Sequence, residues 1–105
     1  MAVIVVPHNE PKIVARWAFR TLLERLASEL EDEGDRYAVR QAIALDGLHF
    51  ARLDGDRAVR LAVRLAKVAD ELRLELSRTP SDDDRDRQFA EFLAVLEMQL
   101  HDIYE

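Results

Sequence analysis

The sequence predicts a mainly α-helical fold: an antiparallel four-helix bundle with a short second helix and a short N-terminal strand. Three observations support this prediction. Apolar residues recur every three or four positions over long stretches. Glycine, proline and capping residues separate these stretches at short intervals. Residues 3–6 are all β-branched and precede a proline, which is typical of a short strand.

The composition indicates one folded domain spanning residues 1–105. Hydrophobic residues make up 49% of the chain and charged residues 34%, which is typical of a folded rather than a disordered chain. The absence of cysteine excludes disulfides and thiolate metal sites. The apolar start is too short for a signal sequence, and no stretch approaches the ~20 apolar residues of a membrane span. We therefore expect a cytoplasmic protein that does not associate with membranes.

The first helix is expected over about residues 11–32. Asn9 is the candidate N-cap, and Pro11 would fall in the first turn, where its missing N–H costs little. Gly34 would end the helix. Trp17 lies in the middle of the apolar stripe and is expected to be largely buried. The stripe consists of Ile13, Trp17, Leu22, Leu23, Leu26 and Leu30.

A second, short helix is expected to begin at an N-cap on Asp35 and to end near Leu45, with Gly47 as its stop. An irregular or short 3₁₀ connection would follow. It would place three apolar side chains in the core: Leu48, Phe50 and Leu53.

Residues 41–53 have two other interpretations. Asp46-Gly47 between alternating apolar residues favours a β-hairpin. The fold would then be α+β, with a small sheet from residues 3–6, 41–45 and 48–53, although the preceding alanines disfavour strands. A DNA-reading helix-turn-helix is disfavoured, because Gly55 would break the recognition helix and neighbouring aspartates would repel phosphate.

The third helix is expected to begin at a cap on Asp54 or Asp56 and to end at Thr79-Pro80. Its core stripe is Leu61, Leu65, Val68, Leu72 and Leu76. Ser81, followed by Asp84, gives the outline of a capping box and starts the fourth helix. The core stripe of that helix is Phe89, Phe92, Leu93, Leu96, Leu100 and Ile103.

The residues that could carry chemistry give little support for an enzyme. Three isolated glycines cannot form a phosphate-binding loop, and no serine lies in a nucleophile elbow. Glu97 and His101 stand one helical turn apart, but such a lone pair is more often a surface contact than a metal site. We therefore predict no catalytic residue and no cofactor.

An acidic cluster lies at the expected end of the first helix: Glu29, Glu31, Asp32, Glu33 and Asp35. Negative charge there opposes the helix dipole, so helix stability does not explain it. Glu29 with Asp32 or Glu33 has a spacing that could hold a hard cation, and these three are the weak metal candidates. The favoured interpretation is a solvated helix end without a metal.

A basic stripe runs along the third helix and consists of Arg57, Arg60, Arg64 and Lys67. It could contact phosphate or an acidic partner. The net charge of −6 and the mixing of acidic with basic residues argue against nucleic-acid binding. A solvated helix face is therefore the favoured interpretation.

The function expected from these features is that of a small, non-catalytic interaction or regulatory protein that acts through protein–protein contacts. Two alternatives are a weak nucleic-acid binder that uses the basic stripe, and a metal-dependent enzyme or cation-binding protein. A homodimer is predicted as well, because a lone strand lacks a partner in a helical domain and the fourth helix carries apolar residues outside its core stripe. The predicted interface consists of Val3, Ile4, Val5, Val6, Val95, Met98 and Tyr104.

Overall fold

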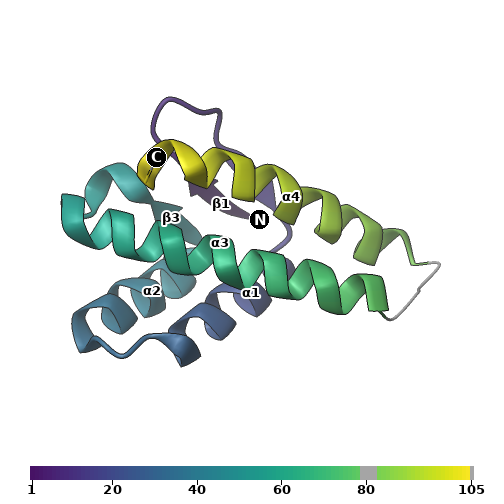
Figure 1. Ribbon diagram of the computed structural model, residues 1–105, viewed down its shortest axis with the longest axis horizontal. Helices are drawn as coiled ribbons and strands as arrows, with labels where there is room; N and C mark the ends of the chain where they lie inside the picture. The colour runs from purple at the N-terminus through teal and green to yellow at the C-terminus, as the bar shows by residue number, and fades with distance from the viewer. Residues whose placement is uncertain (79–82, 105) are drawn as a thin grey trace.

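The computed structural model describes residues 1–78 and 83–104, which form four helices and a small sheet (Figure 1). The helices are α1 (Arg16–Glu29), α2 (Glu33–Leu45), α3 (Gly55–Arg78) and α4 (Asp84–Tyr104). The strands are β1 (Ala2–Val5), β2 (Lys12–Val14) and β3 (Gly47–His49), and η1 (Phe50–Arg52) is a short 3₁₀ helix. The predicted mainly α-helical fold with a short strand region is confirmed.

β1 is the central strand of the sheet, in the order β2-β1-β3. It pairs antiparallel with β2, where Val3 lies opposite Ile13, and parallel with β3, where Val3 lies opposite Gly47. The strand predicted at residues 3–6 is therefore present, shifted by one residue. The prediction that it has no partner within its own chain is wrong, because two further short segments are extended.

The first helix begins at Arg16, later than predicted. Residues 12–14 form β2 instead, because two of them are β-branched and β1 offers free backbone groups for pairing. Asn9 does not cap α1. Its side-chain amide donates a hydrogen bond to the carboxylate of Asp102 at 2.9 Å, which ties the turn before β2 to the end of α4.

The junction of the first two helices also differs from the prediction. α1 ends at Glu29, and Gly34 is not its stop but lies in the first turn of α2. The N-cap of α2 is Asp32, whose carboxylate accepts a hydrogen bond from the backbone N–H of Asp35 at 2.9 Å. A Cβ at position 34 would stand 2.6 Å from Nη2 of Arg57. A side chain at position 34 would therefore require the flexible end of the Arg57 side chain to shift.

α2 ends at Leu45, as predicted, but its cap is Asp46, which has a left-handed backbone with φ of 53°. Gly47 begins β3. Because residues 41–45 are helical, the hairpin interpretation and the sheet that it would build are wrong, although residues 47–49 do join the sheet. A three-residue 3₁₀ helix follows in place of a recognition helix, so the helix-turn-helix interpretation is wrong too.

α3 and α4 lie side by side and run antiparallel (Figure 1). Most of their predicted core side chains are buried: Leu61, Leu65, Val68, Leu72, Phe89, Leu93, Leu96 and Leu100. The others pack partly buried against this core: Leu76, Phe92 and Ile103. Leu48 and Phe50 are buried and Leu53 is half-buried, which confirms the prediction for the connection. The helix end at Thr79-Pro80 and the capping serine, Ser81, lie outside the described residues.

Trp17 is half-buried rather than largely buried, because it lies in the first turn of α1 instead of mid-helix. Its ring meets Phe89 edge to face, with centroids 5.3 Å apart, and the guanidinium of Arg85 lies 4.4 Å from its centroid. The tryptophan therefore connects the start of α1 to the start of α4.

We expect Trp17→Ala to lower the free energy of unfolding by about 1–3 kcal/mol, below the ~3–5 kcal/mol of a fully buried aromatic ring. Urea unfolding followed by circular dichroism measures this loss. The control Trp17→Phe keeps a ring against Phe89 and should lose less than half as much. A loss of about 3–5 kcal/mol or more, as for a fully buried ring, would contradict the half-buried placement.

Candidate functional site

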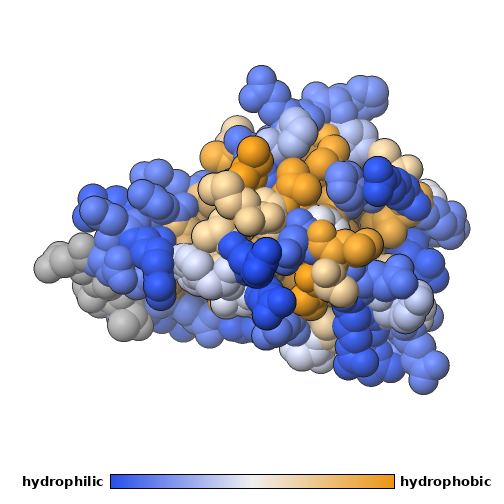
Figure 2. All heavy atoms as spheres, turned by 180° about the vertical axis from the view of Figure 1, so that it is seen from behind, coloured by the Kyte–Doolittle hydropathy of each residue, from blue (hydrophilic) through white to orange (hydrophobic). Residues whose placement is uncertain are grey.

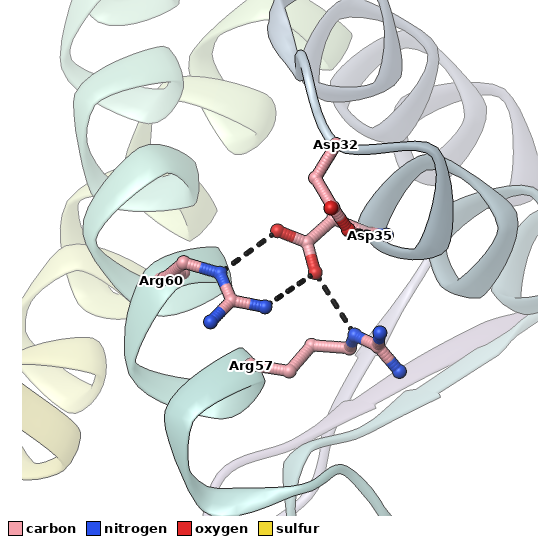
Figure 3. A network of polar contacts seen from close by, with 4 residues as sticks. All are labelled: Asp32, Asp35, Arg57 and Arg60. Atoms are coloured by element: carbon pink, nitrogen blue, oxygen red, sulfur yellow. Dashed lines mark hydrogen bonds and ion pairs between the residues drawn. The ribbon is translucent and has the colours of Figure 1, made fainter.

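One charged side chain is buried in the described part of the chain, and it lies between α2 and α3. Asp35, 3% exposed, accepts hydrogen bonds from Nε of Arg57 at 2.9 Å and from Nε and Nη2 of Arg60, each at 3.0 Å. Figure 3 shows both arginines reaching from the first turns of α3 to this one carboxylate. The cluster joins the start of α2 to the start of α3.

The chemistry of this cluster is that of a structural ion pair. The hydrogen bond from Arg60 lowers the pKa of Asp35, burial opposes this effect, and Arg57 adds to the lowering. A carboxylate that stays ionised and accepts several hydrogen bonds is a poor general base. Asp35 therefore positions helices and is not proposed as a catalytic residue.

The acidic cluster has a different setting from the predicted one. Its central members lie at the N-terminus of α2, where negative charge is stabilising, rather than at the C-terminus of α1. Asp32 caps α2, and Glu33 and Asp35 lie in its first turn. Residues 1–78 and 83–104 contain no group of three His, Asp or Glu side chains that could hold a metal ion, so Glu29, Asp32 and Glu33 are not gathered into one.

The predicted basic stripe is divided by these contacts. Arg57 and Arg60 bind Asp35, whereas Arg64 and Lys67 are exposed and form no ion pair within the described residues. Only half of the stripe is therefore available to an outside ligand. The other half stabilises the fold.

The outer face of the sheet is largely apolar, with His49 of β3 beside Val5 as a polar neighbour. Along β1, Ala2 and Ile4 are buried, while Val3 and Val5 point to the opposite side and are partly exposed. Ile13 lies opposite Val3 on β2 and is 66% exposed. In Figure 1 the sheet lies behind α3 and α4, and Figure 2 shows apolar side chains gathered in the middle of that rear face. We call Val3, Val5 and Ile13 the outer sheet face.

The predicted interface is only partly accessible. Ile4 and Val6 are fully buried in the core and are not accessible to a partner; Ile4 lies on the inner face of β1, and Val6 follows the end of that strand. On α4, Met98 is 73% and Val95 38% exposed, while Tyr104 is half-buried with its ring centroid 5.1 Å from that of His101.

Glu97 forms a further link between α3 and α4. Its Oε2 lies 3.1 Å from Nε of Arg73. Burial raises the pKa of Glu97, and the charges of Arg73 and His101 oppose this rise. The predicted pair of Glu97 and His101 thus belongs to the packing of two helices, and no third ligand joins it in the described part of the chain.

A groove between α1 and α2 was missed by the sequence analysis. It is lined by Glu24, Ala27 and Ser28 of α1 and by Arg36, Arg40 and Ile43 of α2, and its volume is about 420 Å³. The arginines stand four residues apart on one helix, a spacing that places both on one side. This spacing can be recognised in the sequence, but it indicates a groove only when α1 is known to pack against α2.

The comparisons with known proteins identify no relative: no protein-family model, curated protein or solved structure matches this chain. Within the described residues, no helix is long and apolar enough to cross a membrane.

Proposed function

We propose that the chain is a non-catalytic interaction protein and that its outer sheet face binds a second copy of the chain. The observation that supports this proposal is the row of apolar side chains on that face, above all Ile13 at 66% exposure. A sheet that is apolar on both faces needs a cover on each. The core covers the inner face, whereas the described residues leave Ile13 open.

Charge favours a second copy as the cover. Both signs of charge lie next to the outer sheet face, because Arg16, shortly after β2, and Asp46, directly before β3, form an ion pair whose Nε and Oδ2 are 3.0 Å apart. A border that carries both positive and negative charges can pack against its own copy without placing only like charges opposite each other. A two-fold interface, the commonest arrangement of homo-oligomers, brings each such face onto itself. The dimer predicted from the sequence is thus retained, with a different interface, and a cytoplasmic location stays a prediction.

The other two functions are not proposed. Asp35 forms ion pairs with Arg57 and Arg60, so only half of the basic stripe is left to bind phosphate. The weak metal candidates lie at a helix N-terminus, where the dipole explains their charge.

Static light scattering coupled to size exclusion tests the proposal. We expect a dimeric mass for the wild-type chain, a monomeric mass for Ile13→Lys, and a dimeric mass for the control Met98→Lys. The control replaces a similarly exposed apolar side chain on α4, at 73% exposure against 66% for Ile13. A monomeric wild-type chain at about 100 μM would contradict self-association. If Met98→Lys is monomeric and Ile13→Lys is dimeric, the interface lies on α4 and not on the outer sheet face.

A further inference from the structure

Two arginines of α2 lack an acidic partner among the residues that the structure describes. Arg36 and Arg40 form no ion pair and no side-chain hydrogen bond within residues 1–78 and 83–104, whereas Arg25, Arg57 and Arg73 each bind a carboxylate. Arg64 and Lys67 of α3 also have no ion pair within the described residues, but Arg36 and Arg40 both line one groove.

The groove beside them has an apolar floor. Ala27 is buried and Ile43 is half-buried against the core. On their other side the same two arginines line a second hollow, together with Glu33 and Tyr37, whose side chain is 64% exposed. Arginine and tyrosine are enriched at protein interfaces, where they combine a polar tip with a large contact area.

The spacing of the charges defines the ligand. Residues four apart on a helix are separated by about 6 Å along its axis, so two carboxylates four residues apart on another helix match Arg36 and Arg40. A groove between two packed helices accepts the side-chain ridge of a third helix. An apolar residue between the two carboxylates would then contact Ile43.

We propose that the groove between α1 and α2 binds an acidic amphipathic helix of a partner protein. This inference rests on the proposed role as an interaction protein but uses a surface other than the outer sheet face. Glu24 and Glu33 flank the two arginines. They would repel a continuous phosphate backbone, so a short acidic pair with neutral or basic residues on either side fits better than nucleic acid.

Fluorescence anisotropy with a labelled probe peptide tests this proposal. The probe is a helical peptide with two glutamates four residues apart beside a leucine stripe, and its control has glutamine in place of both glutamates. We expect Arg36→Gln/Arg40→Gln to weaken binding of the acidic peptide by about tenfold or more, the range for two charge-assisted contacts. The matched variant Arg64→Gln/Lys67→Gln, which removes two unpaired basic residues of α3, should bind it as the wild-type chain does.

Three results would overturn the proposal: equal binding of both peptides, an equal loss in the α3 variant, or no binding of the acidic peptide at millimolar concentration. If a single-stranded RNA binds more tightly than the acidic peptide, and if this binding requires Arg36 and Arg40, the ligand of the groove is a nucleic acid and not an acidic helix. Repeating the titration with Ile13→Lys separates the two proposals. Peptide binding by a monomeric variant supports the groove whatever the oligomeric state of the wild-type chain.

Discussion

Phe50→Ala is expected to lower the free energy of unfolding by about 3–5 kcal/mol, the range for removing a fully buried aromatic ring. Phe50 is 2% exposed and lies in η1, the connection between the sheet and α3. The surrounding helices and strands cannot collapse onto the cavity without moving β3, which is hydrogen-bonded to the central strand. The stability of a small domain is of the same order, so this variant should be close to unfolding at room temperature.

Urea unfolding followed by circular dichroism checks this expectation, with Leu53→Ala as the matched control. Leu53 is in the same connection but only half-buried, so its loss should be clearly smaller. Equal losses for the two variants would show that the connection does not enter the core as described.

The second large effect is expected when both partners of Asp35 are removed. Arg57→Met/Arg60→Met leaves a buried carboxylate without a counter-charge, which destabilises proteins by about 3–5 kcal/mol. Adding Asp35→Leu to this variant should recover most of the loss, because a buried ion cluster and an apolar replacement are often of similar stability. If the triple variant is no more stable than the double variant, the arginines act through packing and not through the charge of Asp35.

The pH dependence gives an independent readout of the same cluster. The pKa of Asp35 is lowered in the folded wild-type chain, so its contribution is present at neutral pH and is lost as the pH falls through the folded pKa. In Arg57→Met/Arg60→Met, burial without a partner should raise that pKa above its unfolded value. The stability of this variant should therefore increase on acidification from neutral pH, opposite to the contribution in the wild-type chain. Thermal unfolding at several pH values measures the difference.

Helical periodicity predicted the fold class because the core stripes of α3 and α4 are long and regular. Local signals failed where two interpretations of one residue compete. Gly34 resembles a helix stop, yet it lies in the first turn of α2, beside the end of the Arg57 side chain. Asp32 is followed three residues later by Asp35, the same spacing as Ser81 and Asp84, and this spacing indicates a helix N-cap. The signal was overlooked because the first helix was expected to extend to about residue 32.

A strand of three residues is too short to give a recognisable pattern of apolar and polar residues in the sequence. β2 and β3 exist because β1 supplies a partner, and that pairing is non-local. The burial of Ile4 and Val6 could not be foreseen without it. For the same reason the outer sheet face was only partly predictable: Val3 and Val5 were selected from the sequence, but Ile13 was assigned to the core stripe of the first helix.

The most direct measurement of the central claim, that the outer sheet face joins two copies, is site-specific cross-linking. The chain has no cysteine, so a single introduced thiol is the only reactive one. We expect Ile13→Cys to be converted into a covalent dimer by a short bismaleimide much faster than Met98→Cys at the same protein concentration. Equal rates for the two variants, or a faster reaction of Met98→Cys, would contradict an interface centred on the outer sheet face.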